Sequence, residues 1–492
     1  MQLKTLNDIA KHLLLTDQLS FKQNPIIKGI ETDSRKVKPN DLFICISGYT
    51  VDGHDYVHQA IAQNAVAIIA EKQIDQVDIP VIYVENTNEA LGFLANYFYD
   101  FPSNQLHLIG VTGTNGKTSV TYLLDDIFKY NLKKTALIGT IEMKIVDQIY
   151  PIDNTTPESS FLQKGFSEMV YKNVDHCMME VSSHALELGR VNGCDFDIAV
   201  FTNLSQDHLD FHGTMDDYLR AKMRLFERLG NKYRIDKPKY AVLNRDDPHF
   251  FSLKKATSQR VVTYGIEHPA DFMAKDIQLS THGTVFTLVV FNSEFKITTP
   301  LIGKFNIYNI LAATVTAYLS GVSIHIIKGA LAETSSIRGR FETVKGKQGF
   351  TVIIDFAHTP DSLENVLKTI RAFARNKVYL VMGCGGDRDR SKRPLMAAVG
   401  EKYADFLILT SDNPRTEDPS VIISDMKKGL ESDRYVVKMD RLKAIHHAID
   451  LAEKNDCILI AGKGHETTQT IGYKAIPFDD YKVAYEAIEE RS

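Results

Sequence analysis

The segment GVTGTNGKTS, residues 110–119, constrains the fold of this chain more than any other stretch. It continues the apolar run LHLIGV and precedes VTYLLDDIF, which has the apolar spacing of a helix. A glycine-rich turn between a strand and a helix presents backbone N–H groups and the positive end of the helix dipole to an anion. Lys117 supplies charge for the β- and γ-phosphates of a nucleotide, and the hydroxyl of Thr118 can bind Mg²⁺. The segment therefore predicts an α/β domain that binds a nucleoside triphosphate.

One position departs from the usual phosphate-loop pattern. That pattern has glycine five residues before Gly116, where this chain has Val111, and Gly110 is out of register by one residue. The alternative is a glycine-rich turn from strand to helix that binds no nucleotide. A kinase, a hydrolase and a ligase can all begin with such a loop, so the loop alone does not identify the reaction.

The composition limits the class of protein. At 492 residues the chain is long enough for about three domains, and its net charge of −5 favours neither nucleic-acid binding nor an acidic disordered tail. The five cysteines are far apart and none forms a C-x-x-C pair, so neither structural zinc nor a disulfide framework is expected. The N-terminus does not read as a secretory leader, and no apolar run reaches the length of a membrane span. We expect a cytoplasmic monomer that binds neither nucleic acid nor a membrane.

Short apolar runs alternate with helical patterns along the whole chain, which predicts an α/β fold. Polar, proline-containing YFYDFPSNQ suggests a first boundary near residue 100, and SSIRGRFE suggests a second near residue 335. We therefore expect a small N-terminal α/β domain (1–100), a central P-loop-type α/β ATPase domain (101–335) and a C-terminal Rossmann-like α/β domain (336–492). In the third domain, apolar strands end in polar, glycine-rich turns, where open parallel sheets bind their ligands.

Further motifs follow in order along nearly the whole chain. They are NTTPE (154–158), MEVSSHAL (179–186), TNLSQDHLDFHG (202–213), YLRAKMRLF (218–226), GKFNIYN (303–309), RGRFE (338–342), DFAHTPDSLENVL (355–367), GCGGDRDRSKRP (383–394), SDNPRTEDP (411–419) and GKGHE (462–466). Together with G-T-N-G-K-T, this set resembles the Mur ligases, and among them the members that add the third residue of the peptidoglycan stem peptide.

The resemblance implies an ATP-dependent ligase that adds meso-diaminopimelate to UDP-N-acetylmuramoyl-L-Ala-D-Glu through an acyl phosphate. Residue chemistry agrees with such a reaction. A carboxylate is a poor electrophile, and its phosphorylation by ATP activates it for attack by an amine. Several phosphate oxygens then need cations, and the resemblance implies two Mg²⁺ ions.

The resemblance also implies the metal ligands. Glu180 and His208 would hold the second ion and Thr118 the ion beside the nucleotide. From residue chemistry alone, the neighbouring Asp207 is a further candidate oxygen ligand. The family lysine that matches Lys222 is carboxylated by CO₂, which would turn a cation into a metal-binding anion. On sequence alone, His208 could instead be an ordinary polar histidine, and Lys222 reads more simply as a solvated lysine on a helix. In the family the catalytic group comprises Lys117, Glu180, His208 and Lys222.

The resemblance assigns binding residues to two substrates. The residues matched to ATP contacts are Gly113, Thr114, Asn115, Gly116, Lys117, Thr118, Ser119, Asn306, Arg340, Asp355 and His358. The residues matched to contacts with the UDP-muramoyl-dipeptide are Ser34, Tyr49, Thr50, Val51, Asn154, Thr155, Thr156, Ser182 and Arg190. Taken alone, several of these are also typical helix-cap, connector or turn residues. Leu188 stands where the resemblance leads us to expect a glutamine, so that hydrogen bond is missing here.

The amine substrate is predicted from the C-terminal motifs. The residues matched to the diaminopimelate pocket are Arg388, Asp412, Asn413, Pro414, Arg415, Gly462 and Glu466. Diaminopimelate has one carboxylate more than L-lysine, and the planar fork of Arg415 suits a carboxylate. Lysine-adding relatives tend to lack this arginine, so we expect diaminopimelate, with L-lysine as the alternative. Arg415 could also be a loop arginine paired with Glu417 or Asp418.

Two rival functions stay open from the sequence. Folylpolyglutamate synthetases share the phosphate loop, but the first 100 residues and the DNPR and GKGHE motifs are similar to the Mur ligases instead. A nucleotide-regulated binding protein could keep the loop without chemistry, although the candidate metal ligands and Lys222 are intact. Turnover of ATP that depends on the other substrates would distinguish these possibilities.

Overall fold

The computed structural model describes residues 3–14, 21–48, 51–152, 154–233, 235–280, 283–346 and 348–491. The chain forms two compact units. The first comprises Met1–Gly110, Lys133–Ala199 and Arg224–Lys239, and the second Val111–Leu132, Val200–Met223 and Tyr240–Ser492. Three elements contain residues of both units, namely β7 (His107–Thr112), β12 (Ile198–Phe201) and α8 (Met215–Glu227).

The N-terminal part of the first unit is a parallel sheet of order β3-β4-β5-β6 with helices on both faces. Its elements are β1 (Lys4–Thr5), α1 (Leu6–Leu14), β2 (Ile26–Ile27), β3 (Gly29–Glu31), β4 (Asp41–Ile44), η1 (Gly53–Tyr56), α2 (Val57–Ala62), β5 (Ala67–Ala70), β6 (Val81–Tyr83), α3 (Thr87–Phe98) and η2 (Pro102–Gln105). Leu42 and Ile44 pack with α1 and α3, whereas Phe43 packs with α2. This alternation buries both faces of β4, as expected for a central parallel strand.

The rest of the first unit carries a second group of strands. Its elements are β8 (Thr135–Ile138), β9 (Met143–Ile145), β10 (Gln148–Tyr150), α5 (Ser159–Tyr171), β11 (His176–Glu180) and α6 (Ser183–Glu187). Strand β8 pairs in parallel with β11 and antiparallel with β9. All five residues of β11 are buried, and the last of them, at the carboxyl end of the strand, is Glu180.

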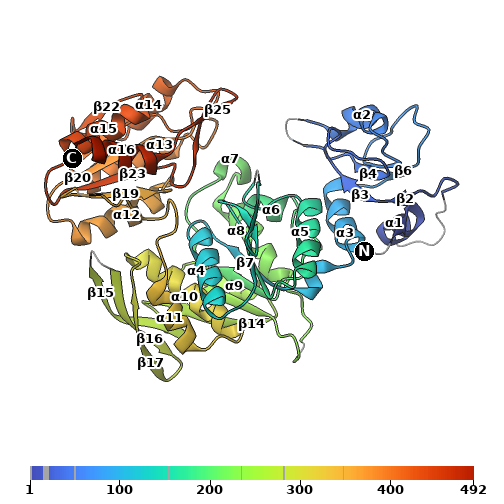
Figure 1. Ribbon diagram of the computed structural model, residues 1–492, viewed down its shortest axis with the longest axis horizontal. Helices are drawn as coiled ribbons and strands as arrows, with labels where there is room; N and C mark the ends of the chain where they lie inside the picture. The colour runs from blue at the N-terminus through green and yellow to red at the C-terminus, as the bar shows by residue number, and fades with distance from the viewer. Residues whose placement is uncertain are drawn as a thin grey trace. The chain divides into compact units, whose positions relative to one another are not determined.

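The second unit begins with the phosphate loop and continues into an antiparallel ribbon. Its first elements are α4 (Lys117–Tyr130), α7 (Leu209–His212), β13 (Tyr240–Asn244), α9 (Phe250–Lys255), β14 (Arg260–Gly265), β15 (Phe272–Ser280), β16 (Gly283–Val290), β17 (Ser293–Thr299), α10 (Lys304–Leu319) and α11 (Ile324–Glu333). Strands β13, β14 and β15 are parallel, and β15, β16 and β17 are antiparallel. Helix α10 packs on α4 (Figure 1). Most residues of α10 are buried, which explains why the helix has no polar face.

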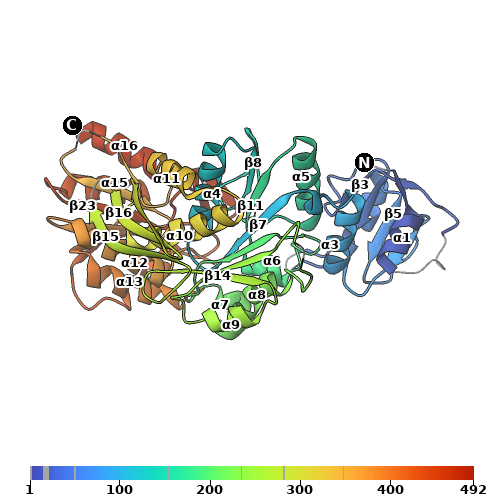
Figure 2. The same cartoon turned by 90° about the horizontal axis from the view of Figure 1, so that it is seen from below.

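The C-terminal part of the second unit is a six-stranded sheet of order β18-β19-β23-β20-β21-β22. Its elements are β18 (Glu342–Thr343), β19 (Thr351–Asp355), α12 (Pro360–Phe373), β20 (Val378–Met382), α13 (Lys392–Tyr403), β21 (Phe406–Leu409), α14 (Pro419–Lys427), β22 (Tyr435–Val437), α15 (Arg441–Leu451), β23 (Cys457–Ala461), β24 (Thr468–Ile471), β25 (Lys474–Pro477) and α16 (Asp480–Arg491). Strand β18 is antiparallel and the other five are parallel. Helices α12, α13 and α14 cover one face, and α15 and α16 cover the other. Figure 2 shows the two helix layers on opposite sides of β23.

Local sequence explains where these helices begin. Thr359 and Ser362 form a reciprocal capping box at the start of α12, and Pro360 occupies its first turn. The apolar face of α12 is buried in the core through Leu363, Val366, Leu367 and Ile370, with Phe373 half-buried at its edge. The cap fixes the turn between β19 and α12, where His358 lies.

The predicted mixed α/β class is confirmed, and the C-terminal sheet has the two-sided parallel arrangement of a Rossmann-like domain. The boundaries near residues 100 and 335 stay predictions. Across the ranges described above, no helix is long and apolar enough to cross a lipid bilayer.

A buried ion pair ties α16 to the sheet and generates a stability prediction. Arg441 and Asp480 are both fully buried and lie 2.7 Å apart, and Arg441 also donates to the carbonyl oxygen of Ala461. Replacing Arg441 by Leu leaves the Asp480 carboxylate buried and unpaired, so we expect a loss of about 3–5 kcal/mol in unfolding free energy. Urea unfolding measures it. The control Lys304→Met breaks an exposed pair with Glu267 and should cost about 1 kcal/mol at most; equal losses in both variants would contradict the prediction.

Candidate functional site

The phosphate loop lies between β7 and α4, as predicted. Gly113 and Gly116 have φ angles of +147° and +88°, which L side chains rarely adopt. A Cβ on Gly113 would lie 1.9 Å from Oγ1 of Thr202, and one on Gly116 would lie 2.3 Å from Oδ1 of Asn309. Backbone conformation and close packing therefore both require glycine at these two positions.

The TNLS segment that follows β12 is hydrogen-bonded to the phosphate loop. The Thr202 hydroxyl donates to the carbonyl oxygen of Asn115 at 2.6 Å, and the Thr114 amide donates to the carbonyl of Asn203 at 2.8 Å. The Asn115 amide donates to the side chain of Asn203 at 2.9 Å. These bonds fix the loop before any ligand arrives, which lowers the ordering cost of anion binding.

Two lysines converge on one carbonyl oxygen of this loop. Lys117 and Lys222 donate to the carbonyl of Gly113 at 2.9 and 3.0 Å. Lys222 is only 1% exposed, so the interpretation as a solvated lysine is wrong. Burial first, and the charge of Lys117 second, hold the pKa of Lys222 well below its usual value. Both effects disfavour the protonated form of Lys222.

A buried carboxylate, Asp207, gathers basic groups beside the loop. Its oxygens lie 3.3 Å from Nε2 of His208, 3.7 Å from Nε2 of His358 and 3.8 Å from Nζ of Lys392. Burial alone would raise the pKa of Asp207, but His358 and the other basic neighbours lower it below its ordinary value. The cluster brings together the predicted residues His208 and His358. Lys392 was not predicted as a site residue, although it lies within the GCGGDRDRSKRP motif.

Two further predicted nucleotide residues lie in the RGRFE connector (338–342) and in β19. Arg340 donates from Nη2 to the Thr118 hydroxyl at 2.9 Å, and its guanidinium lies over the ring of Phe356. Asp355 accepts from the amides of Phe341 and Ala357, both at 2.7 Å, and burial raises its pKa. Asp355 therefore holds the connector in place rather than facing outward.

Four further predicted nucleotide residues have other surroundings. Asn306 is buried in the first turn of α10 and donates to the carbonyl of Ile302. Asn115 donates from Nδ2 to Asp361 at 2.9 Å. Thr118 and Ser119 are buried in the first turn of α4.

Glu180 is the predicted metal ligand in the first unit. Its carboxylate is fully buried and accepts from the backbone amide of Thr140 at 2.8 Å and from its hydroxyl at 3.0 Å. Among the described residues no basic side chain pairs with it. A buried carboxylate without a basic partner suits a divalent cation. No three His, Cys, Asp or Glu side chains gather into a metal site in the described ranges, so a metal would also need hydroxyl, phosphate or other oxygens.

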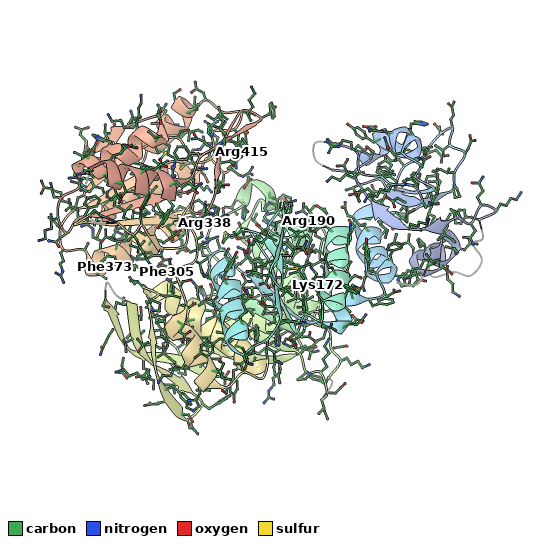
Figure 3. The ribbon with its side chains drawn as sticks, in the orientation of Figure 1. Lys172, Arg190, Phe305, Arg338, Phe373 and Arg415 are labelled. Carbon is green, nitrogen blue, oxygen red and sulfur yellow. The ribbon has the colours of Figure 1, made fainter. Side chains whose placement is uncertain are left out.

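The predicted muramoyl-dipeptide residues of the first unit cluster beside Glu180. The Thr156 hydroxyl donates to the carbonyl of Glu180 at 2.8 Å and accepts from the amide of Ser182 at 3.0 Å. Arg190 donates to the carbonyl of Thr156 and lies 2.8 Å from the carboxylate of Glu158 (Figure 3). Thr155 contacts the hydroxyl of Thr140, whereas Asn154 is exposed. Leu188 is half-buried and cannot replace the amide donor expected there.

The predicted uridine segments are only partly described. The Ser34 hydroxyl is buried and donates to Gln59 of α2 at 2.9 Å. Val51 is exposed, and its carbonyl accepts from the amide of Gly48. Tyr49 and Thr50 lie outside the described residues.

The predicted amine-binding arginines lie side by side at the carboxyl end of the C-terminal sheet. A Cβ on Gly385 would lie 3.0 Å from Nη1 of Arg415 and 3.8 Å from Cγ of Arg388. Burial first, and the charge of Arg388 second, lower the pKa of Arg415. Figure 3 labels Arg415, which donates to the carbonyl of Gly386 at 2.7 Å. Two neighbouring guanidinium groups favour an anionic ligand.

The structure does not pair Arg415 with Glu417 or Asp418. Glu417 pairs with the buried guanidinium of Arg393 at 2.7 Å. Asp418 caps α14 by accepting from the amide of Ser420. Within the described part of the chain, the loop-pairing alternative for Arg415 is therefore absent.

The remaining predicted pocket residues adjoin these arginines. Asn413 donates to Oε2 of Glu466 at 2.8 Å. Asp412 and Pro414 are buried. Gly462 has a φ of +113°, and a Cβ there would lie 2.6 Å from Oδ2 of Asp412. Lys463, which was not predicted, is fully buried between Asn413 and Glu466.

Comparison with known proteins identifies a family. The chain matches the family profiles described as "Mur ligase family, catalytic domain" at residues 26–99, "Mur ligase middle domain" at residues 111–317 and "Mur ligase, glutamate ligase domain" at residues 339–464. It is 55% identical over 470 residues to the UDP-N-acetylmuramoyl-L-alanyl-D-glutamate–2,6-diaminopimelate ligase of Bacillus cereus, covering 96% of each chain.

Solved structures of Mur ligases also match this chain. A structure of a UDP-N-acetylmuramoyl-L-alanyl-D-glutamate–2,6-diaminopimelate ligase is 32% identical, with a TM-score of 0.69 over 100% of this chain and 99% of the other. The MurF ligase of Thermotoga maritima in complex with ADP is 19% identical and shares the fold, with a TM-score of 0.67 over 94% and 99% of the two chains.

The lowered pKa of Lys222 predicts how stability depends on pH. Between the folded pKa and the unfolded pKa of about 10.4, the unfolded chain binds more protons at this residue than the folded chain. In CO₂-free buffer, raising the pH toward about 10 should therefore stabilise the wild type relative to Lys222→Met, with a slope of at most about 1.4 kcal/mol per pH unit. Urea unfolding of both proteins across pH measures this difference. A difference that stays constant with pH would show that Lys222 keeps an ordinary pKa.

Proposed function

The chain belongs to the Mur ligase family, and on that basis we propose that it is an ATP-dependent ligase that joins meso-diaminopimelate to UDP-N-acetylmuramoyl-L-alanyl-D-glutamate in peptidoglycan precursor synthesis. The similarity to the Bacillus cereus ligase over almost the full length of both chains supports the reaction. The observation that carries the choice of amine is the placing of two arginines beside Gly385: a Cβ there would lie 3.0 Å from Nη1 of Arg415 and 3.8 Å from Cγ of Arg388, and, after burial, the charge of Arg388 lowers the pKa of Arg415.

ATP is the co-substrate, in keeping with the ADP bound by the Thermotoga maritima relative. The backbone N–H groups of Lys117, Thr118 and Ser119 in the first turn of α4 bind the phosphate oxygens, and the Lys117 side chain turns from the carbonyl of Gly113 toward the β- and γ-phosphates. Arg340, within hydrogen-bond distance of Thr118, adds positive charge at the same end of the loop. Asn306, His358 and the buried Asp355 support the nucleoside part.

The chemistry proceeds in two displacements. In the first, a carboxylate oxygen of the D-glutamyl group attacks the γ-phosphorus of ATP, the bond to the β-phosphate oxygen breaks, and ADP leaves. In the second, the neutral amine nitrogen attacks the acyl carbon, the carbon–oxygen bond to phosphate breaks, and the amine proton leaves with the released phosphate or solvent. Charge develops on phosphate oxygens in both displacements, so fixed cationic donors favour each transition state.

Mg²⁺ fits the residues proposed for it. Thr118, Glu180, His208 and a carboxylated Lys222 are the proposed ligands, and the buried carboxylate of Glu180, which has no basic partner among the described residues, supports the assignment. When bound, Mg²⁺ neutralises phosphate oxygens and orients them for in-line displacement. Carboxylation of Lys222 begins from its neutral amine, which attacks the carbon of CO₂ and then loses a proton to form a carbamate.

The remaining substrate contacts follow the clusters described above. In the first unit, Ser34, Tyr49, Thr50 and Val51 are proposed to bind the uridine end. Thr155, Thr156, Ser182 and Arg190, with the exposed Asn154, are proposed to bind the muramoyl-dipeptide. For diaminopimelate, Arg388 and Arg415 bind its carboxylates, and Asp412 and Glu466 bind its ammonium groups.

A release assay for inorganic phosphate tests the proposed reaction. Full-length protein is incubated with ATP, Mg²⁺ and UDP-N-acetylmuramoyl-L-Ala-D-Glu, with meso-diaminopimelate, L-lysine or no amine. We expect turnover with diaminopimelate and little with the other two. Preference for L-lysine would keep the ligase and overturn the amine. Turnover with folate and glutamate instead would favour the folylpolyglutamate synthetase alternative, and ATP binding without amine-dependent turnover would favour a binding protein.

The arginine pair predicts a specific kinetic effect. Arg415→Ala leaves the distal carboxylate of diaminopimelate without its bidentate partner, a loss of about 2–5 kcal/mol. At about 1.4 kcal/mol per tenfold, kcat/KM for diaminopimelate should fall roughly 30- to 3,000-fold, while the KM for ATP stays nearly unchanged. The control Arg375→Ala removes an exposed arginine that follows α12 and should have no such effect. A fall of less than about threefold in Arg415→Ala would exclude Arg415 from the pocket.

A further inference from the structure

Lys463 is a buried cation within the GKGHE motif, and the proposed reaction assigns it no role. Its side chain is fully buried, which is rare for lysine unless the ammonium is paired. Its Nζ donates to Oε2 of Glu466 at 2.8 Å, to Oδ1 of Asn413 at 3.1 Å and to the carbonyl oxygen of Thr468 at 2.6 Å. An ammonium group has three donors, and each of the three has a partner.

The three partners belong to three different segments. Asn413 lies in the loop after β21, Glu466 in the loop after β23, and Thr468 is the first residue of the β24–β25 hairpin. Asn413 also accepts from the amide of Thr470 in the hairpin at 2.9 Å. One buried ammonium therefore joins both loops of the proposed amine pocket to the hairpin beside them.

The hairpin in turn holds Arg415. The amide of Arg415 donates to the carbonyl of Thr470 at 3.1 Å, and the amide of Gly472 donates to the carbonyl of Arg415 at 2.7 Å. Arg415 has a φ of +52°, an uncommon and strained conformation for a residue with a side chain. The two backbone bonds offset this strain, so the direction of the guanidinium depends on the position of the hairpin.

Lys463 also sets the charge that Glu466 presents. Oε2 of Glu466 is occupied by Lys463 and Asn413, which leaves Oε1 as the oxygen available to a ligand. Without the ammonium, the pocket would carry one more uncompensated negative charge. That charge would oppose the binding of a carboxylate-bearing amine.

We propose that Lys463 is the positioning residue of the amine pocket: it holds Asn413, Glu466 and the β24–β25 hairpin in place and thereby orients Arg415 toward the diaminopimelate carboxylate. The assignment of the pocket to diaminopimelate rests on the proposed function. The linkage between Lys463 and the hairpin does not depend on it.

Hydrogen exchange tests the linkage without any substrate. Lys463→Met keeps the length of the side chain and removes the charge and all three donors. In the full-length variant we expect the amides of residues 412, 413, 415, 416 and 468–476 to exchange at least fivefold faster, while those of α12 are unchanged. Lys443→Met, a substitution of an exposed lysine on α15, is the matched control and should leave both regions as in the wild type. Unchanged exchange in the hairpin of Lys463→Met would overturn the proposal.

Steady-state kinetics tests the consequence for the substrate. We expect the KM for meso-diaminopimelate to rise at least tenfold in Lys463→Met, with kcat and the KM values for ATP and the UDP-linked substrate within threefold of the wild type. An unchanged KM for diaminopimelate, or an equal loss for all three substrates, would overturn the positioning role. A wild type that does not use diaminopimelate would instead overturn the proposed function, and the exchange result would still decide the linkage.

A second variant covers the case in which Lys463→Met does not fold. Lys463→Gln retains a donor for Asn413 but carries no charge, and the same two measurements apply to it. If thermal unfolding shows that Lys463→Met is not folded, Lys463→Gln decides the proposal by the same outcomes.

Discussion

The carbonyl oxygen of Gly113 is the point on which the nucleotide end of the site depends. It accepts from Lys117 and from Lys222, and this position requires glycine because Thr202 leaves no room for a Cβ. Two ammonium groups cannot share one buried oxygen without strong repulsion. Burial first, and the charge of Lys117 second, lower the pKa of the less exposed lysine, Lys222. A lowered pKa favours the uncharged, nucleophilic form of the amine, which the proposed carboxylation by CO₂ requires.

The amine pocket uses buried charge in a different way. The ammonium group of Lys463 donates to oxygens from three segments, so its charge serves to hold the pocket together. The pKa of Arg415, by contrast, is lowered by burial first and by repulsion from the charge of Arg388 second, which Asp412, Glu466 and Asp387 offset in part. A carboxylate ligand would relieve that repulsion. At this edge of the sheet, the charge of Lys463 is therefore paired within the protein, whereas Arg388 and Arg415 remain available to a substrate.

Much of this architecture could be predicted from the sequence. The apolar periodicity of residues 360–373 and the polar turns after the strands were sufficient for the α/β class and for the ends of the strands that carry the site. The sequence motifs also indicated which loops would carry Glu180, His208 and Arg415. Short-range patterns succeed here because strand, turn and helix each depend on neighbouring residues.

Burial and partner choice could not be predicted in the same way. Lys222 lies on a helix with charged neighbours in sequence, and nothing local indicates that its side chain reaches the carbonyl of Gly113, 109 residues away. Lys392 was overlooked for the same reason, because Asp207 is distant in sequence. Two partners of Lys463, Glu466 and Thr468, are near in sequence, but Asn413 is 50 residues away and no local pattern indicates that the side chain is buried. The identity of a lysine therefore says little until its surroundings are known: in water it is a solvated cation, burial beside a second lysine lowers its pKa, and three oxygen partners stabilise its charge. The chemistry of this site therefore depends on which of these environments the fold gives each lysine.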